Sequence, residues 1–205
     1  NRPNNPRDAK LHDFRGLSGQ IAGGIVKVGQ RVMALPSGMK STIEEIWTYD
    51  GPLQEAFCPQ SVTIRLADDI DISRGDMLVA LENLPGMSTE LHGKVCWMHP
   101  RPLVAGRKYL LKHTTQTVQA VVTAIESKID IHTYEALPEP GELAMNDIGT
   151  IRIKTAKPLV YDGYGTNRLT GAFILIEPGS NLTVAAGMLN PPTEAVRPEY
   201  NDFAI

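Results

Sequence analysis

The sequence contains few of the features that mark secreted or membrane proteins. Its 205 residues include only two cysteines, Cys58 and Cys96, and each is flanked by apolar residues. Two such cysteines do not make a disulfide framework, and they suit reduced thiols in the core of a cytoplasmic protein. No apolar run reaches the roughly 18 residues of a membrane-spanning helix, and the polar residues 1–10 do not resemble a signal peptide. We therefore predict a soluble, cytoplasmic chain with no membrane partner.

An excess of positive charge is also lacking. Twenty Lys and Arg stand against 23 Asp and Glu, which gives a formal net charge of −3, and the calculated pI is about 6.0. Domains that bind nucleic acid usually carry a basic face and a pI above about 9. The composition therefore predicts no nucleic-acid partner.

Long helical periods are absent, and short strand-like segments take their place. The chain has 18 glycines and 15 prolines, which divide it into short segments of apolar or alternating character. Such strands, separated by Gly/Pro turns, are typical of all-β barrels or sandwiches. The predicted strands are 17–22, 31–35, 41–49, 62–67, 77–81, 91–98, 107–113, 117–127, 149–155, 171–176 and 182–189. The predicted domains are a linker at 1–10, β-domains at 11–87 and 88–190, and a tail or linker at 191–205.

The glycine-rich stretch 14–38 lacks the spacing of a nucleotide-binding loop. Neither GxxxxGK[ST] nor GxGxxG occurs in it. The segment therefore lacks the lysine and hydroxyl group that contact phosphates, and the glycine spacing that lets the backbone come close to them. Glycine adopts positive φ without a Cβ clash and therefore marks turns and bulges in β structure. We expect strands at 17–22 and 31–35 to form a first hairpin, with Gly23-Gly24 and Val28-Gly29 as its turning points.

No catalytic, cofactor or metal site is predicted from the spacing of polar residues. His92, Cys96 and His99 lie close in sequence, but in a strand His99 takes the opposite face, and structural zinc needs four converging ligands. The acidic segment 68–76 lacks the glycine and glutamate positions of an EF-hand loop. We expect it to be a solvated acidic turn.

The basic residues are concentrated in one segment, Arg107, Lys108, Lys112 and His113. Strand alternation places Lys108 and Lys112 on one face, and His113 on the other. This segment is either a solvated strand face or a polar contact to a partner chain. Separately, Arg168 precedes the most apolar strand, where its planar guanidinium group could brace a loop by hydrogen bonds to backbone carbonyls.

Several longer motifs resemble known proteins closely. RGLSGQIAGGIVKVGQRV is similar to the opening of the second domain of translational GTPases such as elongation factor Tu, and NRLTGAFILIEPGSNLTVAAGM is similar to the closing hairpin of their third domain. More specific are ISRGDMLV, YLLKHTTQTVQA, ELAMNDIG, KPLVYDGYGTNRLTGAFILI and TVAAGM. Together these resemble the large, GTPase-type subunits (subunit 1) of bacterial sulfate adenylyltransferase, or the same region of bifunctional proteins that also contain adenylylsulfate kinase.

The resemblance covers about residues 11–190 and implies a fold and a role. The fold would be two consecutive elongation factor Tu-like β-barrels, of the domain II and domain III types. The complete family enzymes convert ATP and sulfate to adenylylsulfate and pyrophosphate, driven by GTP hydrolysis. GTP and magnesium would belong to a GTPase domain that this sequence lacks, and the barrels would dock that domain and a small catalytic subunit. We expect this chain alone to be inactive.

Two alternatives remain at this stage. The barrels could grip tRNA, as those of a translational GTPase do, although the net charge of −3 weighs against this interpretation. Alternatively, the parent chain could continue into an adenylylsulfate kinase domain after residue 205.

Overall fold

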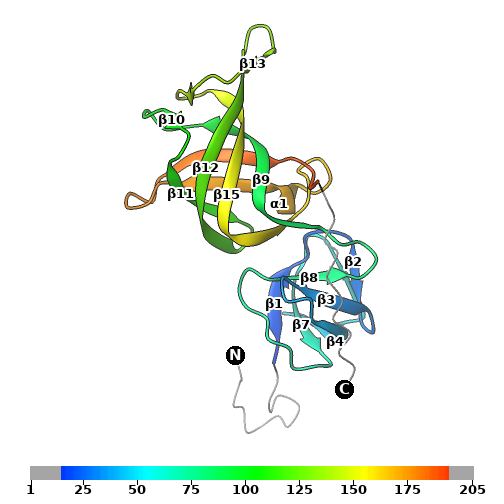
Figure 1. Cartoon of the computed structure of the whole chain (residues 1–205). Coiled ribbons are helices and arrows are strands. Elements are labelled where there is room, and N and C mark those ends of the chain that lie inside the picture. Colours follow the sequence, from blue (N-terminus) through cyan, green and yellow to red (C-terminus); the bar gives the residue numbers. More distant parts are fainter. Residues whose placement is uncertain (1–14, 194–205) are drawn as a thin grey trace. The chain divides into compact units, whose positions relative to one another are not determined.

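The computed structural model describes residues 15–193, so the predicted linker at 1–10 and most of the predicted tail at 191–205 lie outside the described residues. The chain separates into two compact units, with the division between Leu84 and Pro85. The predicted boundary between residues 87 and 88 falls instead within a strand, β9 (Gly86–Trp97). Each unit is a β structure with its own core (Figure 1).

From residue 15 onward, the first unit contains eight strands, of which six form one sheet. The strands are β1 (Leu17–Gln20), β2 (Ile25–Lys27), β3 (Arg31–Leu35), β4 (Lys40–Thr48), β5 (Gly51–Leu53), β6 (Glu55–Phe57), β7 (Ser61–Leu66) and β8 (Met77–Ala80). The sheet runs β1-β7-β4-β3-β8 with β5 paired to β4, and β2 and β6 form a separate ribbon. Its core consists of Val32, Ile43, Ile46, Ala56, Val62 and Ile64. Alternating apolar residues such as Val62 and Ile64 point inward, as a half-buried strand requires.

The predicted first hairpin is wrong, although both of its strands exist. Strand β1 pairs with β7, from Leu17 opposite Ile64 to Gln20 opposite Ser61. Strand β3 pairs with β4 and β8 instead. The physical reason lies between the two strands: Gly24 (φ +69°) and Gly29 (φ +83°) each turn the chain. The segment between them therefore forms a strand of its own, β2, which pairs with β6.

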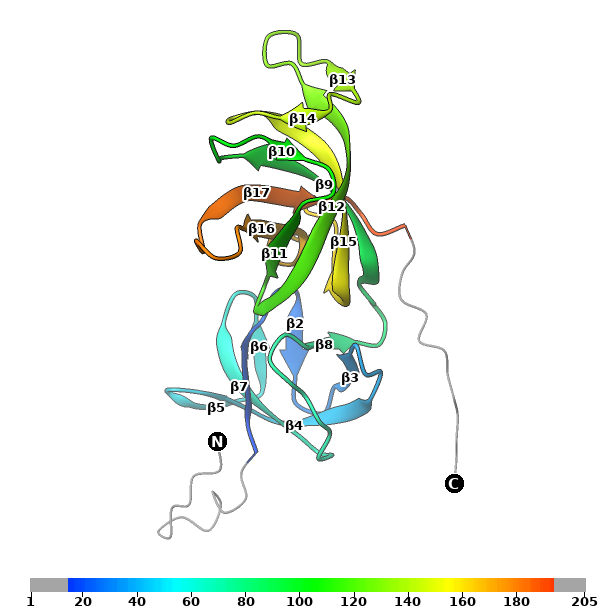
Figure 2. The ribbon, with the colours of Figure 1, turned by 60° about the vertical axis from the view of Figure 1, so that its left-hand side comes forward.

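The second unit is a closed barrel, shown from a second side in Figure 2. Its strands are β9, β10 (Leu103–Val104), β11 (Lys108–His113), β12 (Gln116–Ile129), β13 (Ala136–Pro138), β14 (Glu142–Leu143), β15 (Ile148–Tyr161), β16 (Ala172–Ile176) and β17 (Thr183–Leu189). The order is β11-β16-β17-β9-β15-β12, and an additional pairing of β11 with β12 closes the ring. The predicted all-β fold of two consecutive barrel-type units is thereby confirmed.

The interior of the second barrel follows the alternation of its strands. The fully buried side chains include Leu91, Trp97, Leu111, Val122, Ile151, Ile153 and Leu175. Strand β15 is longer than the predicted strand 149–155 and continues past Pro158. A proline has no backbone N–H and cannot donate a hydrogen bond to the neighbouring strand. The register shifts between Lys154 and Leu159 and so accommodates the proline.

Helix is nearly absent from the described residues. Between 15 and 193 the only α-helix is α1 (Arg168–Gly171), a single turn. None of the helices in this part of the chain is long and apolar enough to cross a membrane.

Candidate functional site

The outward face of the second barrel contains a continuous group of apolar side chains. One register row runs Ile174, Ala186, Cys96 and Ile148 across strands β16, β17, β9 and β15. Residues opposite each other in adjacent strands share a face, so this row lies outside the barrel. Neighbouring outward positions extend it, and together they form what we call the outer apolar face: Cys96, Leu110, Ile148, Ala172, Ile174, Ile176, Ala186 and Met188.

Three exposed lysines lie on the same outward side of these strands. Lys112 stands opposite Ile174 on strand β11, and Lys94 stands opposite Met188 on strand β9. Lys108 is exposed and shares the outward side of β11 with Lys112. Among residues 15–193 none of the three makes an ion pair. An apolar surface flanked by cations without acidic partners suits a partner whose own rim is acidic.

His113 does not belong to this basic surface, as strand alternation predicted. Its side chain is 1% exposed, and its Nε2 donates a hydrogen bond to the carbonyl oxygen of Thr170 at 2.7 Å. Burial lowers the pKa of His113 below its ordinary value of 6.5, and the bond to Thr170 and the charge of Asp162 oppose this only in part. The ring is therefore neutral at pH 7 and serves the interior of the barrel.

Arg168 does not brace its loop by any hydrogen bond to the described residues. It is exposed on α1, whereas Asn167 caps that turn by accepting hydrogen bonds from the backbone N–H groups of Leu169 (3.0 Å) and Thr170 (3.4 Å). The hydroxyl of Thr170 donates to Asp162 at 2.6 Å. The amide cap and this hydroxyl–carboxylate bond hold the loop for which Arg168 was one candidate brace.

His92, Cys96 and His99, which lie close together in sequence, have different surroundings in the structure. His92 and Cys96 share the outward face of β9, and Nδ1 of His99 accepts the backbone N–H of Arg101 at 3.1 Å. No group of three or more His, Cys, Asp or Glu within residues 15–193 is placed to hold a metal ion.

The acidic segment is engaged in local contacts. Asp69 and Asp71 pair with Arg15, and Asp68 accepts the hydroxyl of Ser41 at 2.7 Å. Asp76 accepts the backbone N–H of Ser73 at 2.8 Å, which closes the turn before β8.

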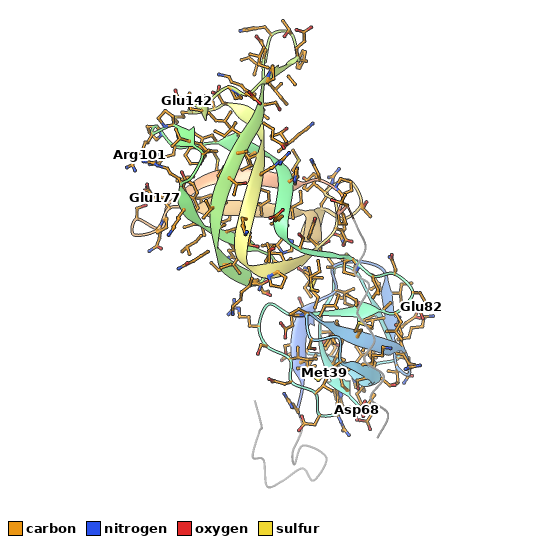
Figure 3. All side chains as sticks on the ribbon, in the orientation of Figure 1. Met39, Asp68, Glu82, Arg101, Glu142 and Glu177 are labelled. Carbon is orange, nitrogen blue, oxygen red and sulfur yellow. The ribbon has the colours of Figure 1, made fainter. Side chains whose placement is uncertain are left out.

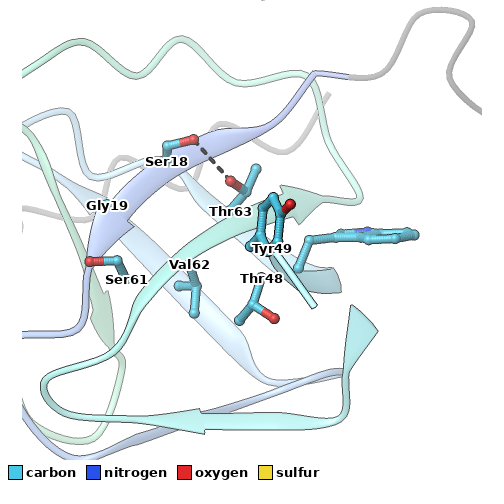
Figure 4. Close-up of a pocket in the computed structure, with 8 residues that line it drawn as sticks. Ser18, Gly19, Thr48, Tyr49, Ser61, Val62 and Thr63 are labelled. Carbon is cyan, nitrogen blue, oxygen red and sulfur yellow. Dashed lines mark hydrogen bonds between the residues drawn. The ribbon is translucent and has the colours of Figure 1, made fainter. Parts of the chain in front are cut away.

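An open hollow of about 350 Å³ lies on the first unit, over strands β1 and β7 (Figure 4). Ser18 and Thr63 share a hydrogen bond of 2.9 Å on its floor. Tyr49 stands beside it, fully exposed. Trp47 also lines it, and the other lining residues are glycine, valine, serine and threonine, so the hollow offers contact area and no acid–base chemistry.

The fold of the chain, two consecutive β-barrel units, resembles that of elongation-factor-like proteins. Residues 90–190 match the family model described as GTP-eEF1A C-terminal domain-like. The structures of Sup35 complexed with GDP and with GMPPNP superpose with a TM-score of 0.79 at 18% identity. Each superposition covers 87% of this chain and 44% of the Sup35 chain.

The curated relatives narrow this class. The chain is 44% identical to the bifunctional enzyme CysN/CysC of Rhodopirellula baltica (86% of this chain, 27% of the relative). It is 41% identical to sulfate adenylyltransferase subunit 1 of Teredinibacter turnerae (94% and 42%) and 42% identical to that of Colwellia psychrerythraea (94% and 41%). The predicted resemblance is confirmed: this chain is a relative of the sulfate adenylyltransferase large subunits. It spans about two fifths or less of the length of these relatives.

Proposed function

We propose that this chain is the non-catalytic barrel region of a sulfate adenylyltransferase large subunit. The complete enzyme would convert ATP and sulfate to adenylylsulfate and pyrophosphate, with GTP hydrolysis as the driving reaction, in the cytoplasm. Identities of 40–44% over 86–96% of this chain support the assignment. The sequence has no GxxxxGK[ST] loop, so its residues do not fit GTP and magnesium. Those ligands would belong to a separate GTPase domain.

The role of the barrels would be docking, and the outer apolar face carries this proposal. Apolar side chains at Ile174, Ile176 and Met188 lie outward on the closed barrel, flanked by unpaired lysines. The occupant that we propose is the small catalytic subunit, which would present an acidic rim to Lys108 and Lys112. Cation–carboxylate complementarity across the rim of an interface speeds association and selects the partner.

Charge reversal at the flanking lysines tests this docking surface. The chain and its K108E/K112E variant would be titrated with the small subunit by calorimetry at 50 and 300 mM salt. We expect about tenfold weaker binding of the variant at low salt and a smaller difference at high salt, because the lost attraction is screened. The single variant Lys112→Glu would be compared with Lys157→Glu as its charge-matched control, since Lys157 is exposed at the β15 irregularity and away from the outer apolar face. Equal weakening by the control would contradict the docking surface.

The elongation-factor-like fold supports a second candidate function, which is binding of tRNA by the barrels. The similarity to Sup35 supports the fold alone, and the net charge of −3 opposes a polyanionic partner. Filter binding with tRNA at low salt separates the candidates: tight, salt-sensitive retention would favour tRNA over the small subunit.

A further inference from the structure

A hairpin arm projects from one end of the second barrel. Strand β12 continues beyond the barrel and pairs there with β13, from Ser127 opposite Pro138 to Ile129 opposite Ala136. Figures 1 and 2 both show β13 and the turn before it lying clear of the barrel body, and Figure 3 labels Glu142 near its base. We call residues 129–142 the acidic arm. Because the arm lies clear of its own barrel, its side chains are open to contact with another molecule.

The acidic arm exposes apolar side chains that contribute nothing to the core. Ile131 is 62% exposed, Tyr134 is 85% exposed and Leu137 is 45% exposed. Scattered apolar residues are ordinary on a protein surface, but three of them within one short turn form a patch, and such patches mark interaction surfaces. Tyrosine is also among the residues that contribute most to binding energy at interfaces.

The tip of the arm is held in one conformation by its own hydrogen bonds. The carboxylate of Asp130 accepts the backbone N–H groups of His132 (2.8 Å) and Thr133 (3.3 Å). The backbone carbonyl of Asp130 accepts the N–H of Tyr134 at 2.8 Å. Tyr134 has a φ of +60°, which is unfavourable for a bulky side chain. An aromatic group that is already fixed at an exposed tip loses little conformational entropy when it binds.

The charges of the arm all have one sign. Residues 129–142 include four Asp or Glu and no Lys or Arg. Among residues 15–193, the carboxylates of Glu135, Glu139 and Glu142 make no ion pair. An apolar patch among unpaired carboxylates suits a surface that combines apolar area with cations.

The outer apolar face of the same barrel has this complementary chemistry. Its apolar side chains are flanked by Lys94, Lys108 and Lys112, which make no ion pair within the described part of the chain. The face is built on strands β9, β11, β15, β16 and β17, whereas the arm is a continuation of β12 that leads away from the barrel. A paired strand does not fold back on itself, so the arm of one molecule would meet the face of another.

We propose that the acidic arm of one copy of this chain binds the outer apolar face of a second copy. Tyr134 lies against the apolar side chains of the face, and Glu135 and Glu139 lie beside Lys108 and Lys112. A contact between two different patches joins copies either reciprocally, around a two-fold axis, or head to tail.

This inference does not depend on the small subunit as an occupant of the face. The small subunit and the arm would compete for it, because both would present carboxylates to the same lysines. Self-association is measured on the chain alone, and small-subunit binding is measured by calorimetry, so either proposal can fail without the other.

Sedimentation velocity of the chain alone, from roughly 10 to 500 µM at low salt, covers the range in which small interfaces associate. We expect species heavier than the 22.4 kDa monomer to appear as the concentration rises, and to diminish at high salt because the attraction is screened. Tyr134→Asn should weaken association about tenfold. Its thermal stability should be unchanged or higher, because asparagine tolerates a φ of +60° better than tyrosine does.

Charge reversal identifies the two surfaces. The variants E135K/E139K and K108E/K112E should each be monomeric, because arm and face then carry like charges. A chain with all four substitutions should associate again, and so should an equal mixture of the two double variants, since opposite charges then meet. The control for the arm is D50K/E82K, which makes the same change in net charge at exposed residues of the first unit. It should associate as the wild type does.

Two results would overturn the proposal. One is a chain that stays monomeric over the whole concentration range. The other is association that the two double variants leave unchanged, or that does not return in the fourfold variant and in the mixture when the melting temperatures match that of the wild type.

Discussion

At the scale of single residues, His113 shows how burial decides the state of a titratable group. Its Nε2–H is satisfied by the carbonyl of Thr170, 57 positions along the chain. Burial holds the pKa of the imidazole below 6.5, because a charged ring in the interior would lose its hydration. The ring behaves as a neutral, hydrogen-bonded part of the barrel core.

This state predicts a pH dependence of stability. The folded pKa of His113 lies below the unfolded value, so the unfolded chain binds more protons between the two. The contribution of His113 is therefore fully present above about pH 6.5 and is lost as the pH falls through the folded pKa. We expect the wild type to lose more stability between pH 7 and pH 5 than His113→Gln, which keeps an N–H donor. Urea unfolding at both pH values measures this, and parallel losses would contradict it.

The sequence predicts which face of a strand each side chain takes, but it does not predict which groups that side chain contacts. Alternation alone placed Lys108 and Lys112 outward and His113 inward, because successive side chains of a strand point to opposite faces. The carbonyl that His113 meets belongs to α1, whereas His113 itself belongs to β11. Only the closed barrel brings those segments together, so no local pattern contains them.

At the scale of elements, strands β16 and β17 approach closely where a glycine faces an aromatic ring. A Cβ added to Gly187 would lie 2.3 Å from Cζ of Phe173, which is 3% exposed. The Phe173 ring thus occupies the space that a side chain on β17 would need. A glycine here is required by packing and not by backbone angle.

Gly187→Ala should therefore destabilise the second barrel by about 1–3 kcal/mol, the usual cost of overpacking a close-packed core. Gly165→Ala is the matched control, because nothing lies within 4 Å of its added Cβ and its φ is not positive. Thermal unfolding of both variants measures the difference. Equal melting temperatures would show that Phe173 can move aside without cost.

Strands with strong alternation were predictable, and very short ones were not. The predicted 31–35 coincides with β3, and 62–67 and 107–113 lie within one residue of β7 and β11 at each end. Strands β2, β5, β6, β10, β13 and β14 have only two or three residues, too few to show a period. The first hairpin was wrong because the pairing of Leu17 with Ile64 is non-local.

At the scale of the whole molecule, each unit has a separate hydrophobic core. Residues of the first core all precede Leu84, and those of the second all follow Pro85. We therefore expect a protein of residues 85–205 to fold alone, with a β-type circular dichroism spectrum and one cooperative thermal transition. A random-coil spectrum for this fragment would contradict the separation of the cores.

The fold class and the family were predictable from motifs, and the similarity to relatives 40–44% identical to this chain confirms the resemblance. The outer apolar face was not, because its members come from strands β9, β11, β15, β16 and β17, and each strand contributes only one to three of them. Sequence alternation supplies the outward positions, and strand order supplies their neighbours. That order is set by long-range pairing.

We propose that these barrels dock the small subunit of sulfate adenylyltransferase and do no chemistry themselves. Titration calorimetry of the purified chain with that subunit, in the absence of any GTPase domain, tests it most directly. We expect a saturable one-to-one complex that weakens with salt, and we expect the chain alone neither to hydrolyse GTP nor to form adenylylsulfate. No heat of binding to the small subunit, or either activity in the chain alone, would contradict it.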